Sequence, residues 1–309
     1  MTRRAGIVLA VLAVAALVAP WFAPYDPGRS FRDYLSAPPM TPGVDGSGLY
    51  ARPLVLVDRL EQRFEPDVTA RAPLPWTASA DDPPVFLLGA DTFGRDVLSR
   101  LLSGARISIG LGLVSTVGAL LVGGLIGAWA GYRGGWVDEL LMRTADLLLV
   151  LPVIYVVLVL RAVLPLVLPP ATVFLLMAGI FVLVGWPIPA RGVRAIVRSE
   201  RDREFVVAAR SLGASNTRIL VHHLLPACGG YLVTQAMLLL PAFVLAEATL
   251  SYVGLGFPPA VATWGTMLAE ASNLAALSRF PWMLAPAVAI FIVVLTANLA
   301  VPRRMSPTS

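Results

Sequence analysis

Few side chains in this sequence could carry out chemistry by themselves. The two histidines, His222 and His223, are adjacent, so they point to different faces of a helix and do not form an H-E-x-x-H metal site. The single cysteine, Cys228, has no disulfide partner and no cysteine cluster for zinc. All 24 basic residues are arginine, which excludes a P-loop lysine for ATP and a Schiff-base or Ser–Lys nucleophile. The sequence therefore predicts no catalytic, metal-binding or cofactor-binding residue.

Two carboxylates lie in or beside strongly apolar stretches, where ionisable groups often serve transport. Glu247 has two open interpretations: it is a carboxylate of a substrate pathway or gate, or it caps the turn at 251–256. Asp146 follows Arg143 by three residues, which favours an ion pair at the inner membrane interface over a proton relay. Trp264 is expected to pack a re-entrant element over the pathway.

A third group of candidate residues lies in the arginine-rich segment 191–226, whose part 191–218 holds seven arginines and three acids. Apolar residues at helical spacing, such as Phe205, Val206, Ala209 and Leu212, predict one short helix, and a second follows a hinge at Gly213. Small residues near the hinge would let a groove of another protein approach the backbone. A basic helix lying on anionic lipid is the alternative.

The amino-acid composition indicates the class of protein whose elements position these residues. The chain has 309 residues, of which 57% are hydrophobic and 14% charged, with a mean hydropathy of +0.76. An ordinary soluble domain is about 45–50% apolar and about 25% charged. The 43 charged residues are clustered, with 20 in segment 25–106 and 10 in segment 191–218. Long apolar stretches separated by two charged segments predict an integral membrane protein.

The predicted fold class is all-α integral membrane with six transmembrane helices, since a helix needs about 20 apolar residues to cross the hydrocarbon layer. The predicted spans are 5–25, 107–132, a third that begins near Leu140 and includes Asp146, 171–190, 229–246 with an extension towards Val253, and 280–302. The first is favoured as an uncleaved span over a signal peptide. The second is rich in glycine, which permits close helix packing.

Two proline-containing stretches punctuate these spans. Pro165, Pro169 and Pro170 predict a tight turn after the third span. The pair Trp186-Pro187 predicts an interface anchor and a kink near the inner end of the fourth span.

The arginines predict the orientation, because short cytoplasmic segments carry more Lys and Arg than external ones. With the N-terminus inside, the short internal segments hold 13 arginines, and the short external ones hold only Arg161 and Arg279. Both termini are therefore predicted to be cytoplasmic. The expected organisation is an N-terminal tip and first span at 1–25, an external loop at 26–105, a core at 106–302 that contains loop 191–226, and a tail at 303–309.

The external loop has two open interpretations, a weakly ordered insertion or a cap that docks an external partner. Residues 54–57 are a plausible strand, and residues 57–64 a possible short helix. Residues 88–108, LGADTFGRDVLSRLLSGARIS, predict an amphipathic helix at the outer interface that leads into the second span, with Asp91 as its N-cap. Its polar positions are Arg95, Asp96, Ser99, Arg100 and Ser103.

Three stretches resemble bacterial ABC-importer permeases of the dipeptide/oligopeptide/nickel class. The cytoplasmic coupling motif of these permeases is Glu-Ala-Ala, three residues, Gly, nine residues and Ile-x-Leu-Pro. Here it stands as Val207-Ala208-Ala209, Gly213 and His223-Leu224-Leu225-Pro226, so that Val replaces Glu and His replaces Ile. Residues 88–108 and 247–268 are similar to two further signatures of the class. The resemblance covers about 88–300, plus the first span in its position.

This resemblance implies an N-terminal span followed by a five-helix permease core in the bacterial cytoplasmic (inner) membrane. The chain would form half of the pathway of an ATP-driven importer for di- or oligopeptides or a related small solute. It would bind no cofactor, because ATP is used by partner subunits. The implied partners are a second homologous permease subunit, two ABC ATPase subunits, an extracytoplasmic solute-binding protein and the lipid bilayer, with no nucleic acid.

The resemblance also implies which residues contact the ATPase. These are Arg203, Glu204, Phe205, Ala208, Ala209, Arg210, Gly213 and Ala214. The alternative function, an ion-coupled secondary transporter or channel, would need intramembrane charges or inverted repeats. No repeat relates the two halves of the sequence, and Asp146 and Glu247 are the candidate charges.

Overall fold

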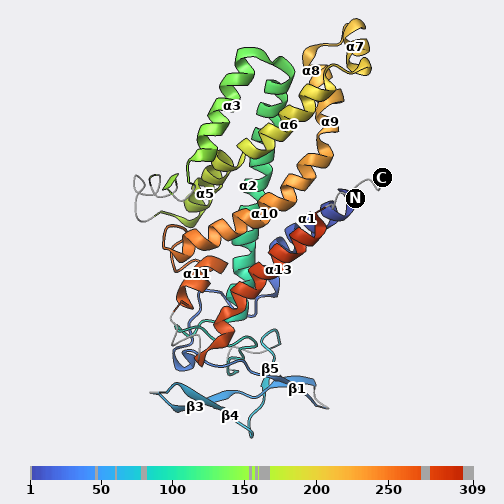
Figure 1. Cartoon of the computed structure of the whole chain (residues 1–309). Helices are drawn as coiled ribbons and strands as arrows, with labels where there is room; N and C mark the ends of the chain where they lie inside the picture. Colours follow the sequence, from blue (N-terminus) through green and yellow to red (C-terminus); the bar gives the residue numbers. More distant parts are fainter. Residues whose placement is uncertain are drawn as a thin grey trace, which may run out of the picture. The chain divides into compact units, whose positions relative to one another are not determined.

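The structure is a computed structural model that describes residues 2–45, 48–59, 61–77, 82–152, 155, 156, 159, 168–272 and 279–301. The chain is mostly helical, with a small β region near its N-terminal end (Figure 1). It divides into two compact units. Unit 1 comprises Met1–Ala13, Leu111–Ala246 and Val293–Ser309, and unit 2 comprises Val14–Gly110 and Glu247–Ile292.

Unit 1 consists of helices. Its elements are most of α1 (Thr2–Val18), the greater part of α2 (Val97–Arg133), α3 (Gly135–Val150), α5 (Pro170–Gly185), α6 (Pro187–Glu200), α7 (Glu204–Ser211), α8 (Asn216–Ile219), the π-helical turn η3 (Leu220–Leu224), α9 (Leu225–Ala227), most of α10 (Gly229–Tyr252) and the end of α13 (Ala285–Ala300).

Close packing of α2 against α6 depends on three glycines spaced four residues apart. A Cβ atom added to Gly123 would contact the carbonyl oxygen of Trp186, and one on Gly127 would contact the backbone of Ala190. A Cβ atom on Gly131 would lie 2.7 Å from the carbonyl oxygen of Arg194. These approaches leave no room for a side chain. The prediction that the glycine-rich second span permits close helix packing is therefore confirmed.

Four helical segments are long and apolar enough to cross a membrane, and these are Ala5–Phe22, Val97–Arg133, Gly229–Tyr252 and Pro281–Ala300. Helices α5 and α6 make a fifth candidate if they are taken as one span bent by 42°. The predicted kink at Trp186-Pro187 is confirmed, although Trp186 itself is buried against Ala145 and Ala190. The chain is thus a mostly helical membrane protein with four to five candidate spans among the described residues.

The third predicted span is only partly described. Helix α3 has 16 residues, and half of residues 151–160, together with the turn at Pro165, lie outside the described residues. The predicted tail at 303–309 also lies outside them.

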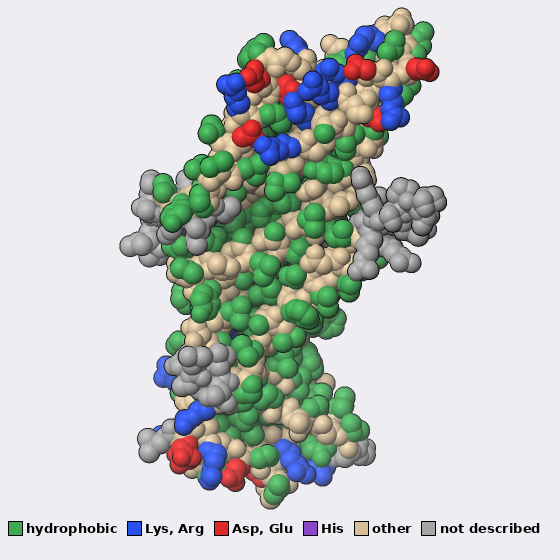
Figure 2. All heavy atoms as spheres, in the orientation of Figure 1, with side chains coloured by type: hydrophobic (Ala, Val, Ile, Leu, Met, Phe, Trp, Pro, Cys, Tyr) green, Lys and Arg blue, Asp and Glu red, His purple; other side chains and the backbone are tan. Residues whose placement is uncertain are grey.

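The candidate spans expose apolar side chains, as lipid-facing helices do. On α1, Ile7, Val11 and Leu17 are exposed, and on α13 Phe291 and Leu299 are exposed. In unit 1, charged side chains gather over the ends of α3 and α6 and over α7 and α8 (Figure 2).

The N-terminal part of unit 2 is an ordered β region. Strands β1 (Pro42–Asp45), β2 (Gly48–Ala51) and β5 (Ala72–Pro73) form an antiparallel sheet in the order β1-β2-β5. Its core includes Met40, Leu54 and Phe86, and the ring of Phe31 packs edge-on against that of Phe86 at 5.3 Å. These contacts favour a folded insertion over a weakly ordered one.

A second sheet corrects one local prediction. Strands β3 (Leu54–Asp58) and β4 (Arg63–Pro66) pair as an antiparallel hairpin. The predicted strand at 54–57 is confirmed, and the predicted helix at 57–64 is wrong. The apolar residues Leu54 and Leu56 alternate with Val55 and Val57, which have greater exposure, and this period of two favours a strand.

The start of α2 corrects a second prediction. The helix begins at Val97 and runs without interruption to Arg133, so the predicted helix does lead into the second span, but residues 88–96 are not part of it. Asp91 is not its N-cap, because it lies six residues before the first helical residue. The carboxylate of Asp96 takes that role by accepting the backbone N–H of Ser99 at 2.7 Å. The polar side chains of Asp96, Ser99 and Arg100 are buried rather than facing water.

The C-terminal part of unit 2 begins with the last turns of α10 and contains α11 (Trp264–Glu270) and the 3-10 turn η4 (Pro281–Leu284) before α13. The side chain of Thr263 accepts the N–H of Thr266 at the start of α11, and the side chain of Thr266 accepts the N–H of Thr263. This capping box fixes where the short helix begins.

Candidate functional site

The segment that links α6 to α10, residues 201–226, is called the coupling segment below. It contains the two predicted short helices, α7 and α8, with Gly213 between them at φ +81°. The N–H of Ala214 donates to the carbonyl oxygen of Ala209 at 3.0 Å, as in a Schellman motif, which requires the left-handed conformation that glycine supplies. Ser215 then caps α8 by accepting the N–H of Arg218. The predicted helices and their hinge are confirmed.

The structure brings the eight predicted ATPase-contact residues together on α7 and the hinge. Six of them are exposed, namely Arg203, Glu204, Phe205, Ala208, Arg210 and Gly213. Ala209 and Ala214 are half-buried, because they pack against the buried cluster that contains Val206 and Ile219. The outer surface of α7 is therefore formed by Ala208 and its charged and aromatic neighbours.

Leu212 adjoins this surface, although it was not among the predicted contact residues. It is 89% exposed, whereas the helical spacing predicted it on the same apolar stripe as Val206, which is fully buried. Helix α7 ends at Ser211, so Leu212 no longer follows the helical direction. It lies directly before the hinge glycine, Gly213.

Hydrogen bonds tie the coupling segment to the last turn of α2. The hydroxyl of Tyr132 donates to Oδ1 of Asn216 at 2.6 Å and accepts from Nη2 of Arg210 at 3.4 Å. Nη1 of Arg201 donates to the carbonyl oxygens of Gly131 and Tyr132. These bonds use orphan carbonyl groups at the end of α2. They attach the segment to a membrane-spanning helix on both sides of Gly213.

Ion pairs join α3 to α6. The Arg194 guanidinium donates two hydrogen bonds to Asp138, one of them from Nη2 to Oδ2 at 2.6 Å. These bonds hold the pKa of the Asp138 carboxyl below its usual range. Arg198 lies 3.9 Å from the same carboxylate. Two arginines of the arginine-rich segment therefore serve packing rather than an external contact.

Asp146 has a different partner from the one predicted. It pairs with Arg191 of α6, while Arg143 pairs with Glu139. The prediction of an ion pair is right and its partner is wrong, because the kink at Trp186 brings α6 alongside α3. Both pairs are about half exposed or more, so each contributes little to stability.

In unit 2, Glu247 is the centre of a buried polar cluster. Its side chain is fully buried, and its carboxylate accepts the hydroxyl of Ser108 at 2.6 Å and that of Ser251 at 2.8 Å. The Ser251 hydroxyl in turn accepts the N–H of Phe257 at 3.2 Å. Such bonds are those expected of a cap for the turn at 251–256. The gate interpretation of Glu247 stays a prediction.

Trp264 lies beside this cluster, at the first position of α11. Its backbone N–H donates to the Ser108 hydroxyl at 3.1 Å, and its indole Nε1 donates to the carbonyl oxygen of Leu101 at 3.0 Å. The ring is buried, and its Cδ1 atom would lie 3.2 Å from a Cβ atom added to Gly104. Glu247 and Trp264 are thus brought together through Ser108.

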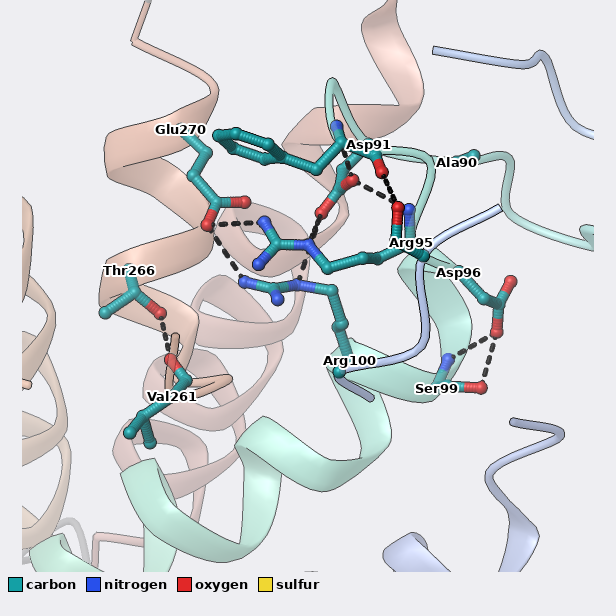
Figure 3. Close-up of polar contacts among 12 residues, drawn as sticks. Ala90, Asp91, Arg95, Asp96, Ser99, Arg100, Val261, Thr266 and Glu270 are labelled. Atoms are coloured by element: carbon teal, nitrogen blue, oxygen red, sulfur yellow. Dashed lines mark hydrogen bonds and ion pairs between the residues drawn. The ribbon is translucent and has the colours of Figure 1, made fainter. Parts of the chain in front are cut away.

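Four charged residues form an ion-pair cluster in the same unit: Asp91 and Arg100, which are buried, and Arg95 and Glu270, whose side chains are 12% and 10% exposed. Figure 3 shows both guanidinium groups pointing towards Glu270. Oε1 of Glu270 lies 2.8 Å from Nη2 of Arg95 and 3.0 Å from Nη2 of Arg100. Oδ2 of Asp91 lies 2.7 Å and 3.5 Å from Nε of the same two arginines. Two positive and two negative charges therefore neutralise each other away from water.

The remaining oxygen of Asp91 shapes the turn before α2. Oδ1 accepts the backbone N–H groups of Phe93 and Arg95, both at 2.9 Å. Gly94, at φ +74°, lies against the backbone of Phe31, where a Cβ atom would overlap. Asp91 and Gly94 are therefore both required by the structure of this turn. The sequence reasoning missed the cluster because Glu270 is 170 residues from Arg100.

Two carboxyl groups of this region have raised pKa values. Burial raises the pKa of Asp96 to about 6, against the opposing effect of its hydrogen bonds from Ser99. Burial also raises the pKa of Glu270, while Arg100 and Arg95 act in the opposite direction. Among the residues that the structure describes, no group of three or more His, Cys, Asp or Glu side chains is arranged to hold a metal ion.

Comparison with known families gives two matches. Residues 123–303 match the model of the binding-protein-dependent transport system inner membrane component. Residues 5–39 match the model of the N-terminal TM domain of oligopeptide transport permease C. The first match contains the coupling segment, and the second contains α1.

Individual relatives agree with these models. The chain is 34% identical to a di/tripeptide transport system permease protein of Pseudomonas aeruginosa, over 95% of this chain and 83% of the relative. It is 39% identical to an oligopeptide transport system permease protein of Bacillus subtilis, over 67% of this chain and 66% of the relative. The chain therefore belongs to the family of inner membrane components of binding-protein-dependent transport systems, as a non-catalytic, multi-pass membrane subunit.

Proposed function

We propose that this chain forms half of the translocation pathway of an ATP-driven importer for di- or oligopeptides or a related small solute. The observation that carries the proposal is the coupling segment: a two-helix element with an exposed contact surface, within a chain that matches the permease family over residues 123–303. The names of the relatives, peptide permeases of several bacteria, support peptides as the substrate. Family membership decides against the alternative of an ion-coupled transporter or channel.

The proposed membrane topology has six spans with both termini in the cytoplasm. The arginine distribution supports it, and so do the candidate spans already found. The third span would start in α3 and end near residue 160. In this topology the ordered region 26–105 lies outside the cell, and the coupling segment lies inside.

The proposed partners are a second homologous permease subunit, two ABC ATPases and an extracytoplasmic solute-binding protein. The family description, a binding-protein-dependent transport system, supports a binding protein and an ATPase. The chain has no lysine for a P-loop, which supports the proposal that the partners use the ATP.

The proposed ATPase contact is the exposed surface of α7 and the hinge, with Leu212 added to the eight residues named from the sequence. Ala208 lies at the middle of this surface, where its small side chain lets a groove approach the backbone. Closure of the ATPases would move the coupling segment, and its bonds to Tyr132 and Gly131 would pass that movement to α2. Glu247 and Trp264 are proposed to belong to the gate at the other end of α2.

Reconstitution tests the proposal. The chain, its partner permease, the ATPases and the binding protein are placed in proteoliposomes, and uptake of a labelled dipeptide, pentapeptide and nickel chelate is measured with and without ATP. We expect ATP-dependent uptake of at least one peptide that also requires the binding protein. Uptake that continues without ATP and follows an ion gradient would contradict the proposal.

A further inference from the structure

We propose that α11 and the first turns of α2 move as one body during transport, and that Glu270 and Glu247 are the positioning residues that hold them together. The inference rests on the proposed function, because it states how the gate that contains Glu247 and Trp264 moves.

The first attachment is at the start of α11. Ser108 of α2 donates its hydroxyl proton to Glu247 and accepts the N–H of Trp264. The orientation of this hydroxyl is therefore set by the Glu247 oxygen that accepts its proton and by the Trp264 N–H that donates to it. Glu247 thus acts on α11 through Ser108, and the indole of Trp264 adds a bond to Leu101 of α2.

The second attachment is at the end of α11. Glu270 is its last residue, and its carboxylate joins the guanidinium groups of Arg95 and Arg100, which lie before and within the first turn of α2. The Arg100 side chain is fully buried and that of Glu270 is 10% exposed. Because the two attachments lie at opposite ends of the helix, α11 is fixed in orientation as well as in position.

The surface between the two attachments is closely packed. A Cβ atom on Gly104 of α2 would lie 3.3 Å from Cα of Thr263 and 3.2 Å from the Trp264 ring. On its other side, Gly265 of α11 lies against the backbone of Ala248, where a Cβ atom would come within 2.8 Å. Trp264, Thr266 and Met267 are each buried. Helix α11 is therefore packed closely against α2 at Gly104 and against α10 at Gly265.

Separation of α11 from α2 would also be electrostatically unfavourable. It would remove Glu270 from two guanidinium groups and leave Asp91 alone to neutralise them. It would also remove the donor of Trp264 from Ser108. Movement of α11 together with the first turns of α2 breaks neither set of contacts.

A disulfide tests whether the two helices separate. In a Cys228→Ser background, Gly104→Cys and Thr263→Cys would place two thiols close enough to bond, since a Gly104 Cβ lies 3.3 Å from Cα of Thr263. In the reconstituted complex, we expect oxidised and reduced forms to take up peptide at rates within about twofold of each other. A loss of about tenfold or more on oxidation, reversed by reductant, would overturn the proposal.

A second measurement applies even if the double variant is poorly active. Met267→Cys places a thiol on the buried face of α11. We expect its labelling by a membrane-impermeant maleimide to stay within about twofold between the nucleotide-free and ATP-trapped complexes. Labelling that rises about tenfold in one state would show that α11 opens independently, and would overturn the proposal.

A matched pair of variants tests the positioning role. Added to Met267→Cys, Glu270→Gln should raise labelling about tenfold, because it removes the charge that holds both arginines, and Glu270→Asp should restore part of the protection. Glu139→Gln, which affects the exposed pair with Arg143, should leave labelling unchanged. Equal labelling in the Glu270→Gln variant and its parent would contradict the role of Glu270.

The two proposals fail in different ways. If the unmodified complex shows no ATP-dependent uptake of any peptide, the proposed function fails. If the unmodified complex transports and the disulfide-linked complex does not, only the single-body movement fails.

Discussion

At the scale of single residues, two buried acidic side chains of unit 2, Asp91 and Glu247, each bring several partners together away from water. The two oxygens of Asp91 accept two backbone N–H groups and contact two guanidinium groups. Glu247 accepts two hydroxyl groups that are themselves bonded to backbone N–H groups. Removal of one member of such a set leaves the others unsatisfied. The consequences can be measured one residue at a time.

The pKa of Asp96 predicts a pH dependence of stability. An unfolded Asp titrates at 3.8 and folded Asp96 at about 6, so the folded state binds the proton more tightly. Its contribution is therefore most favourable below about pH 4 and is lost as the pH rises to about 6, a change of about 3 kcal/mol. We expect Asp96→Asn to remove this part of the pH dependence, measured as the unfolding midpoint in detergent at pH 5 and pH 7.

The control for this measurement is Asp33→Asn, which changes an exposed carboxyl in the same unit. It should leave the difference between the two midpoints as it is in the wild type. If Asp96→Asn shows the same pH dependence as the wild type, burial of the ionised carboxylate does not set the pKa of this residue.

Glu247 gives a second prediction at this scale, which separates its two interpretations. As a cap, Glu247→Ala leaves the Ser108 and Ser251 hydroxyls without their acceptor and should lower stability by about 3 kcal/mol, while Glu247→Gln should lower it by about 1 kcal/mol. The measurement is the unfolding midpoint together with peptide uptake. Full stability in both variants with uptake lost would instead assign the carboxylate to the pathway alone.

At the scale of elements, the geometry of unit 1 depends on how closely α2 approaches α6. The stripe of Gly123, Gly127 and Gly131 allows the two backbones to touch, and the last turn of α2 then reaches the coupling segment through Tyr132. Close backbone approach through small residues is a common way to fix helices in a membrane. It makes the position of α2 sensitive to the position of α6 and of the coupling segment that follows it.

The neighbouring glycines allow a matched test of this contact. A Cβ atom on Gly127 would overlap the backbone of Ala190, whereas none of the described atoms lies within 4 Å of one on Gly124. We expect Gly127→Leu to lower the stability by about 1–3 kcal/mol through overpacking and Gly124→Leu to have little effect. Thermal unfolding in detergent measures both. Equal effects of the two substitutions would contradict the close α2–α6 contact.

How far the sequence predicts these elements depends on the range of the interactions. The hinge at Gly213 and the kink at Trp186-Pro187 follow from local backbone preferences, and the sequence predicts both. The burial of Arg100 and its pairing with Glu270 do not follow from local preferences. The spacing of polar residues in 88–108 is the same whether that face meets water or a buried carboxylate, and Glu270 is far away in the sequence. The cluster and the partner of Asp146 therefore required the fold.

At the scale of the whole molecule, the chain is a membrane subunit that performs no catalysis of its own. Its buried polar residues hold helices together, and the exposed residues of α7 form the surface that we propose for a partner ATPase. Family membership explains this division, because such systems place binding, permeation and ATP hydrolysis in separate subunits. The coupling segment is the part of this chain that movement of the ATPases would displace.

The central claim is tested most directly by the rate of ATP-dependent peptide uptake in complexes that carry Ala208→Asp. Ala208 is exposed, unlike Ala209, so a carboxylate there should leave α7 folded while blocking the groove. The control is Ala208→Ser. We expect Ala208→Asp complexes to assemble and to lose peptide uptake about tenfold or more, with uptake near wild type for Ala208→Ser. Normal uptake by assembled Ala208→Asp complexes would contradict the account.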